Sequence, residues 1–191
     1  MTIEVREEPV SSLTTYGTIP IAFEVVSVFD VEGPAAPLTP SALSERSLAK
    51  PYMKDYDAIP GESPANWPTK FDVTKWGILA AYADEERVGA AAIAYDSADC
   101  NILGGRTDLV ALWDIRILPE LRGKGVGAAL FRAAENWARA RGCRTLIVET
   151  QNNNVPACRF YMSQGCLLDS IKPHAYSALP AEAQMIFRKD L

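Results

Sequence analysis

The chain has 191 residues, of which 48% are hydrophobic and 23% charged, so it can bury a large core without disulfides or a structural metal. Its net charge of −5 and pI of about 5.0 disfavour nucleic-acid binding, which usually needs a basic surface. The four cysteines form no C-x-x-C pair and there is one histidine, so we expect no metal site.

The sequence also bears on the cellular compartment. Residues 1–8 are charged and lack the apolar centre of a signal peptide. No apolar run approaches the roughly 18 residues that a membrane-spanning helix needs. We therefore expect a cytoplasmic protein with reduced cysteines and no membrane partner.

The N-terminal part gives few regular signals. β-Branched and aromatic residues predict a strand over residues 21–29. A helix capped within residues 39–41 is predicted next, with Leu43 and Leu48 on its buried side. Prolines then predict a long irregular segment over residues 51–76, and such segments are often functional.

Regular structure resumes in the middle of the chain. Two apolar runs, residues 76–83 and 88–95, are joined by polar residues 84–87 and predict a β-hairpin. Residues 109–118 are apolar on both faces apart from one acidic and one basic residue, which predicts a central buried strand.

The last third alternates helix and strand. Apolar residues at helical spacing predict a helix over residues 125–141. A strand is predicted over residues 143–150, and a helix over 155–164 follows it. Two short strands, residues 166–171 and 184–188, complete the prediction of an α/β fold.

The central motif is the loop at residues 121–127, where three glycines alternate with two cations and a valine. Glycine permits a tight turn and a close approach of the backbone to a ligand. The helix that starts there presents unpaired N–H groups and a partial positive charge. The loop is therefore predicted to hold a phosphate or diphosphate.

Three alternatives compete for this loop. A P-loop needs Gly-Lys-Ser/Thr, but Lys124 precedes Gly125 and no Ser or Thr follows. Residues 123–128 do match a dinucleotide fingerprint, with Glu149 at a suitable later position, although residues 119–122 separate the glycines from the preceding strand. The loop is also compatible with a plain tight turn between strand and helix.

Two segments carry a family resemblance. Residues 122–127 resemble the R/Q-x-x-G-x-G/A signature of the GNAT superfamily of acetyl-CoA-dependent N-acetyltransferases, and residues 114–119 are similar to that family's fourth strand. Residues 154–165 resemble its N-x-x-A-x-x-[FL]-Y-x-x-x-G-F segment, with Cys166 where the family usually has Phe.

Within the superfamily, residues 51–56 and 148–154 resemble the streptothricin acetyltransferase branch. The resemblance implies one domain over residues 1–191, with a GNAT-like, mixed and mostly antiparallel twisted sheet flanked by helices. Its cofactor-binding core would cover about residues 109–165, and its acceptor-side part about residues 20–75.

The resemblance further implies acetyl-CoA as co-substrate, without a metal. Backbone groups of residues 115–117 would pair with the pantetheine arm, and N–H groups of residues 123–127 would hold the pyrophosphate. The cofactor-binding residues would be Ile115, Arg116, Ile117, Arg122, Gly123, Lys124, Gly125, Val126, Gly127, Asn154 and Tyr161.

Three residues are candidates for proton transfer. Tyr161 matches the family's tyrosine and would protonate the leaving thiolate, whereas Glu149 and Asp114 are candidate bases for the amine. Each has a structural alternative: Asp114 as the partner of Arg116, Glu149 as a solvated charge at a strand end, and Tyr161 as a packed aromatic residue.

We therefore expect an N-acetyltransferase that moves an acetyl group from acetyl-CoA to a primary amine of a cationic small molecule. Streptothricin is the leading candidate, which would imply antibiotic resistance, and the reaction would be direct attack in a ternary complex. The alternatives are a protein or peptide N-acetyltransferase and a non-catalytic module that senses acetyl-CoA; a homodimer is left open.

Overall fold

The computed structural model describes residues 2–31 and 43–191, which form two compact units. The first unit contains the residues up to Ala22, residues 55–146 and Leu191. The second contains residues 23–54 and 147–190.

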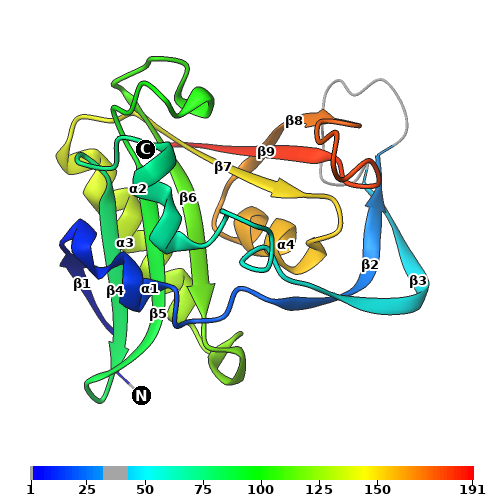
Figure 1. Cartoon of the computed structure of the whole chain (residues 1–191), viewed down its shortest axis with the longest axis horizontal. Helices are drawn as coiled ribbons and strands as arrows, with labels where there is room; N and C mark the ends of the chain where they lie inside the picture. Colours follow the sequence, from blue (N-terminus) through cyan, green and yellow to red (C-terminus); the bar gives the residue numbers. More distant parts are fainter. Residues whose placement is uncertain (1, 32–42) are drawn as a thin grey trace. The chain divides into compact units, whose positions relative to one another are not determined.

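The first unit is built on antiparallel strands in the order β1 (Glu4–Glu8), β4 (Gly77–Ala83), β5 (Glu86–Ala94) and β6 (Leu109–Ile117). Helix α3 (Val126–Ala140) packs against β4, β5 and β6. Figure 1 shows α3 on one face of these strands, and the short helices on the other. These short elements are η1 (Val10–Ser12), α1 (Leu13–Tyr16), η3 (Pro64–Asn66) and α2 (Trp67–Lys70).

Small residues allow α3 to lie close to the strands. A Cβ added to Gly77 would lie 2.5 Å from the indole of Trp137, and one at Gly89 would lie 3.0 Å from Leu130 and Val126. The alanines of β4 and β5 that face the core are fully buried. The helix is therefore held at a fixed depth against the sheet, which also fixes the position of its N-terminus.

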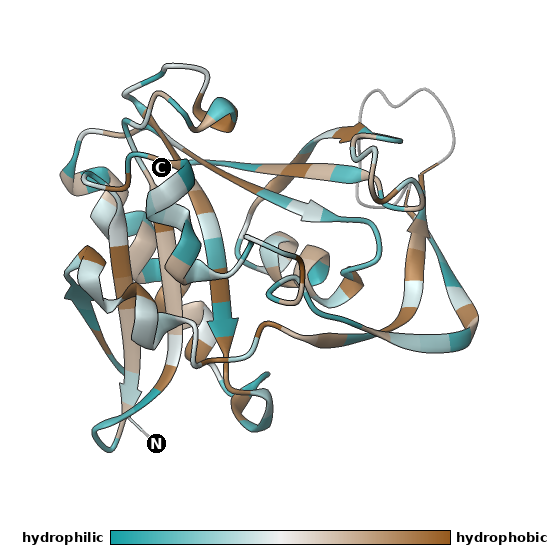
Figure 2. Ribbon diagram, viewed as in Figure 1, coloured by the Kyte–Doolittle hydropathy of each residue, from teal (hydrophilic) through white to brown (hydrophobic). Residues whose placement is uncertain are grey.

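Strand β6 carries an irregularity just before its last residues. Asp114 pairs with Ala92, and Leu112 with Ile93, so Trp113 is an extra residue without a partner on β5. This is the geometry of a β-bulge, which bends a strand and increases its twist. Figure 2 shows β6 as a mostly hydrophobic strand interrupted by hydrophilic positions, as its sequence predicts.

The second unit contains two groups of strands. In the first group, the strands lie side by side in the order β7 (Thr145–Gln151), β9 (Gln184–Asp190) and β8 (Leu167–Lys172). The residues of β7 from Ile147 onward belong to this unit. Strands β8 and β9 are antiparallel. Helix α4 (Val155–Ser163) follows β7. Strands β2 (Phe23–Asp30) and β3 (Ser44–Lys54) form a separate antiparallel pair.

Most predicted elements are confirmed, and the mixed α/β fold with mostly antiparallel strands is as expected. The hairpin between β4 and β5 turns more tightly than predicted, through Asp84 and Glu85 at positive φ of 49° and 66°. Two positive-φ residues are the signature of the turn that best matches strand twist. The described residues contain no helix long and apolar enough to span a membrane.

One prediction for the N-terminal part is wrong, and one strand there has no prediction. The predicted helix over Leu43 and Leu48 is strand β3 from Ser44 onward; its predicted cap lies outside the described residues. Pairing with β2 overrides the local pattern, and residues 48–51 are displaced from the ladder, which accommodates a proline. Strand β1 was not predicted, because its charged sequence becomes a strand only by pairing with β4.

Candidate active site

The glycine loop joins β6 to α3 in the first unit. A single turn, η5 (Pro119–Leu121), leads into it, and the helix begins at Val126. Gly123 and Gly125 have positive φ of 75° and 89°. L-residues with a side chain rarely adopt this conformation, so the loop needs glycine at both positions.

The loop forms an open cradle of N–H groups. Within the described residues, five backbone N–H groups of this loop and the first turn of α3 donate to no acceptor. They are those of Gly123, Gly125, Val126, Gly127 and Ala128. A Cβ added to Gly123 or Gly125 would meet nothing within 4 Å. Unpaired donors beside open space at the N-terminus of a 15-residue helix fit a diphosphate, as the sequence predicts.

The two cations of the loop differ in their surroundings. The guanidinium of Arg122 donates to the carbonyl oxygens of Ile117 at 3.3 Å, Pro20 at 3.3 Å and Ala22 at 3.0 Å. Burial lowers the pKa of Arg122. Arg122 therefore fastens the loop to the end of β6 and to residues 20–22. Lys124 is also exposed, but its side chain makes no hydrogen bond or ion pair within the described residues.

The end of β6 contains Arg116, whose side chain is only 1% exposed. Its guanidinium makes two hydrogen bonds to Asp114, at 3.0 and 2.7 Å, and its nearest contact with Asp57 is also 2.7 Å. Burial by itself would lower the pKa of Arg116, but these carboxylates outweigh it and raise that pKa. The side chain of Arg116 thus holds the fold, and only its backbone is left to meet a cofactor.

Asp114 lies within the same buried cluster. Besides the guanidinium, it accepts a hydrogen bond of 2.6 Å from the hydroxyl of Tyr16. Burial, and then the charge of Asp114, raise the pKa of Tyr16, so this hydroxyl keeps its proton. With both oxygens already bonded and the side chain 7% exposed, Asp114 has the surroundings of a structural partner of Arg116.

Glu149 lies in the second unit, near the end of β7, and is only partly buried. One of its oxygens accepts from the hydroxyl of Tyr176 at 2.6 Å, and the other from the amide of Gln184 at 2.8 Å. Gln151 in turn donates to the hydroxyl of Tyr176 at 3.0 Å. These donors to the carboxylate of Glu149 are uncharged, whereas the carboxylate of Asp114 also bonds the guanidinium of Arg116.

Sequence reasoning missed the residues that hold Glu149. Burial, and then the bond to Glu149, raise the pKa of Tyr176, so it remains a donor at neutral pH. Only Gln151 could have been suggested from the sequence, because residues two apart on a strand, such as Glu149 and Gln151, point to the same face. Tyr176 and Gln184 are distant in sequence, and nothing in their local pattern pointed to Glu149.

Asn154 and Tyr161 both belong to helix α4. Asn154 is its N-cap, and its side-chain oxygen accepts from the N–H of Ala157 at 3.2 Å. The ring of Tyr161 packs edge-on against Phe160 and is tilted against Phe187. The N–H of Cys166, which replaces the family's usual Phe, donates to the carbonyl of Tyr161 at 3.1 Å.

All four cysteines are buried free thiols. Burial raises the pKa of Cys158 to about 12, and burial with the charge of Asp108 also raises that of Cys143. A cysteine nucleophile must form a thiolate. These two thiols are therefore poorly suited to carry an acyl group. The described residues also contain no cluster of metal-ligating side chains.

Comparison with known proteins supports the motif assignments. The profile of the acetyltransferase (GNAT) family matches residues 45–166. Streptothricin acetyltransferase A of Bacillus subtilis (strain 168) is 30% identical over 144 residues, which cover 72% of this chain and 71% of that protein.

Two solved structures share the fold. The crystal structure of nourseothricin acetyltransferase has a TM-score of 0.76 at 23% identity and covers 100% of this chain and 99% of its own. A Bacillus anthracis str. Ames structure in complex with acetyl coenzyme A has a TM-score of 0.75 at 20% identity, with 100% and 98% coverage.

The cradle predicts the effect of a single methyl group. Gly125→Ala should weaken acetyl-CoA binding at least tenfold, measured by calorimetry, because the new Cβ enters the space that faces the unpaired N–H groups. Gly142→Ala is the matched control, since Gly142 also has a positive φ, 74°, and open space, but follows the other end of α3. Both variants should lose about 1 kcal/mol of stability. Equal acetyl-CoA affinities for the two variants would contradict the assignment of the loop.

Proposed function

The chain belongs to the acetyltransferase (GNAT) family and is an acetyl-CoA-dependent N-acetyltransferase, and we propose that its acceptor is a primary amine of a cationic small molecule, with streptothricin as the first candidate. The identity to a streptothricin acetyltransferase over 72% of the chain supports this acceptor. The observation that carries the proposal is the set of contacts of Glu149, whose two carboxylate oxygens accept hydrogen bonds from the uncharged side chains of Tyr176 and Gln184.

The first unit would hold the cofactor. Acetyl-CoA supplies the acetyl group as a thioester. The unpaired N–H groups that start at Gly123 would bind its pyrophosphate, and exposed Lys124 would add a positive charge nearby. The backbone of residues 115–117, directly after the bulge at Trp113, would bond the pantetheine arm.

The amine must lose a proton before it attacks. For an alkyl amine with a pKa of about 10.4, the neutral form costs roughly 4.6 kcal/mol at pH 7. A carboxylate that binds the ammonium group can orient it and pass its proton to water. We assign this role to Glu149, because Tyr176 and Gln184 fix its orientation without cancelling its charge.

Asp114 is the weaker of the two candidate bases. Its charge is balanced by Arg116, and proton uptake would disrupt a buried ion pair. We propose that Asp114 instead positions Arg116 and thereby the backbone of β6. The sequence alone did not indicate which of the two carboxylates is the base. They differ in their contacts: Asp114 bonds the guanidinium of Arg116, whereas the donors to Glu149 are uncharged.

Tyr161 is proposed as the acid that protonates the leaving thiolate of coenzyme A. The ring is fixed on α4 by Phe160 and Phe187, so its hydroxyl would need little reorganisation. Asn154, at the start of the same helix, would fix the turn that follows β7.

Transfer would take place by direct attack in a ternary complex. The nitrogen lone pair would attack the thioester carbonyl and form the N–C bond, and the C–S bond would break. The acylated nitrogen would lose a proton to water, the thiolate would take the proton of the Tyr161 hydroxyl, and Tyr161 would regain a proton from water. The burial of all four cysteines, with the raised pKa of Cys158, supports a route without an acetyl-cysteine.

Thiol release from acetyl-CoA with a panel of amines tests the acceptor. Streptothricin, spermidine and a simple monoamine represent small acceptors, and a peptide with a free N-terminus represents the alternative acceptor. We expect the highest kcat/KM with streptothricin and little release with the peptide. Release with the peptide alone would contradict the proposal.

A control incubation contains acetyl-CoA without an amine. It should leave the mass of the protein unchanged, whereas a stably acetylated protein that passes its acetyl group to an added amine would contradict direct attack.

Glu149→Gln and Asp114→Asn separate the two carboxylates. Glu149→Gln should lower kcat about 10²–10⁴-fold with little change in stability, because it removes the proposed base and keeps a side chain of similar shape. Asp114→Asn should cost about 3 kcal/mol of stability, measured by denaturant unfolding, because Arg116 loses a buried charge partner. A Glu149→Gln variant with the parent kcat, beside an inactive but stable Asp114→Asn variant, would reverse the assignment.

Tyr161→Phe tests the acid. We expect kcat to fall by about 10²-fold or more, because the thiolate would leave without a proton donor, while acetyl-CoA affinity changes less than threefold. Tyr95→Phe is the matched control, since the ring of Tyr95 packs on Trp137 in the first unit. An unchanged kcat in Tyr161→Phe would remove Tyr161 from the mechanism.

A further inference from the structure

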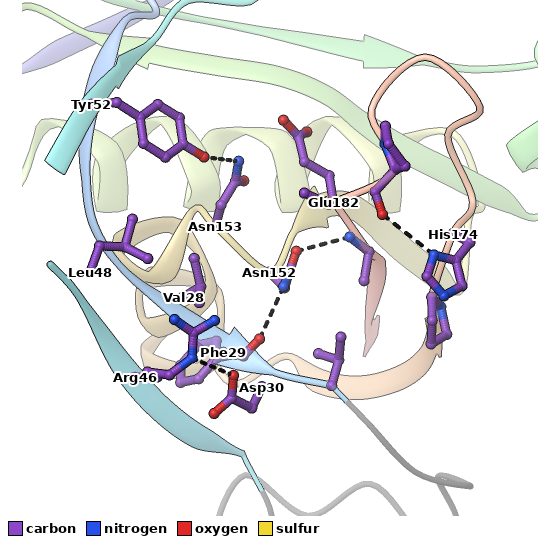
Figure 3. A pocket seen from close by; sticks show the side chains of 15 residues that line it. Val28, Phe29, Asp30, Arg46, Leu48, Tyr52, Asn152, Asn153, His174 and Glu182 are labelled. Atoms are coloured by element: carbon purple, nitrogen blue, oxygen red, sulfur yellow. Dashed lines mark hydrogen bonds and ion pairs between the residues drawn. The ribbon is translucent and has the colours of Figure 1, made fainter. Parts of the chain in front are cut away.

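The second unit contains a pocket that the proposed chemistry does not use. Its volume is about 690 Å³, and its walls come from the end of β2, from β3, from the turn after β7 and from residues 180–183. Figure 3 shows this pocket with Glu182 and Asn153 among its lining side chains. All of its lining residues belong to one unit, so it is defined within that unit alone.

Two buried acceptor atoms at this pocket have no donor. Glu182 Oε2 and Asn153 Oδ1 make no hydrogen bond within the described residues. The side chain of Glu182 is 8% exposed, and Asn153 is 2% exposed. Their other polar atoms are satisfied: Glu182 Oε1 pairs with Lys54, and the amide nitrogen of Asn153 donates to Tyr52 at 3.2 Å. What each residue still needs is therefore a donor.

Unsatisfied acceptors in such a position are costly. An unpaired buried polar group costs about 1–3 kcal/mol, and more if it is charged. The terminal torsions of Glu and Asn are broad and soft, so both oxygens can turn toward a donor in the pocket at small cost. One carboxylate oxygen and one amide oxygen suit a group with several N–H donors, such as an ammonium or a guanidinium.

The pocket is linked to Glu149 through the backbone. Gln184 donates to Glu149, while the preceding residue, Ala183, donates its N–H to the side chain of Asn152 at 2.9 Å. Glu149 and Asn153 are four residues apart, so their Cα atoms lie at most about 14 Å from each other even in a fully extended chain. One elongated molecule can therefore reach both.

We propose that this pocket binds a second basic, donor-bearing group of the acceptor, so that the substrates are elongated molecules with at least two basic nitrogens. This inference rests on the proposed acetylation of cationic small molecules and adds a requirement to it. The amine to be acetylated lies at Glu149, and the second nitrogen at Glu182 and Asn153. Removing either acceptor oxygen should then weaken binding of diamines and leave monoamines unaffected.

The test compares spermidine with a monoamine of similar length in Glu182→Gln and Asn153→Ala. We expect KM for spermidine to rise at least tenfold in both variants, with kcat and the monoamine KM within about twofold of the parent. Because Glu182 also pairs with Lys54, thermal unfolding is measured for each variant, and Asn153→Ala keeps that pair intact. Asp169→Asn is the control for the charge change, since Asp169 pairs with Arg188 on an exposed surface of the same unit.

The outcomes distinguish the two proposals. If the parent protein acetylates both amines, but both pocket variants are folded and leave KM for spermidine unchanged, the second-nitrogen site is overturned and small-amine acetylation stands. An equal rise in KM for both amines would also overturn the site, because it would place the pocket residues at the reacting amine. If the parent acetylates no small amine at all, the proposed function itself fails.

Discussion

A single buried guanidinium organises the first unit. Arg116 is enclosed between the carboxylates of Asp114 and Asp57, lies 5.1 Å from the centre of the Tyr16 ring, and donates to the carbonyl of Ile19 at 3.1 Å. It therefore joins β6 to the residues before β2 and to the segment at residue 57. Removing Arg116 would leave the carboxylates of Asp114 and Asp57 without their cation, and removing either carboxylate would leave Arg116 with a single charge partner; breaking a buried ion pair in this way is strongly destabilising. The stretch of β6 after the bulge is held in place by this requirement.

The position of the glycine loop depends on the same stretch. Arg122 binds the carbonyl of Ile117, the residue that follows Arg116, and also two carbonyls of residues 20–22. The loop is thus fastened at one end by side-chain bonds to backbone and at the other by α3, whose depth is set by Gly77 and Gly89. Between these points the unpaired N–H groups keep their orientation without a ligand, which lowers the entropy lost on binding.

The parts of this chain that could be predicted are those with local causes. The apolar run of β6, the helical spacing in α3 and the glycine positions each follow from neighbouring residues, and Asp114 was conspicuous because it interrupts an apolar strand. Strand β1 could not be predicted, since its charged residues are a strand only beside β4. The partners of Glu149 were equally hidden, because Tyr176 and Gln184 reach it across 27 and 35 residues of sequence.

The same contrast between local and long-range causes applies to the two substrates. The proposed cofactor site follows from neighbouring residues, whereas the proposed acceptor site depends on residues that are distant in sequence. In the proposed site, the cofactor would be bound mainly by backbone groups. Such a site needs glycine at a few positions and otherwise tolerates sequence change, so a short motif suffices to suggest it. In the proposed function, the acceptor would be bound by side chains from separated segments, namely Glu149, Asn153 and Glu182, and each of these could change without altering the glycines of the loop. A chain of this family can therefore keep its cofactor chemistry while its acceptor changes, and the acceptor must be deduced from which buried oxygens still lack a donor.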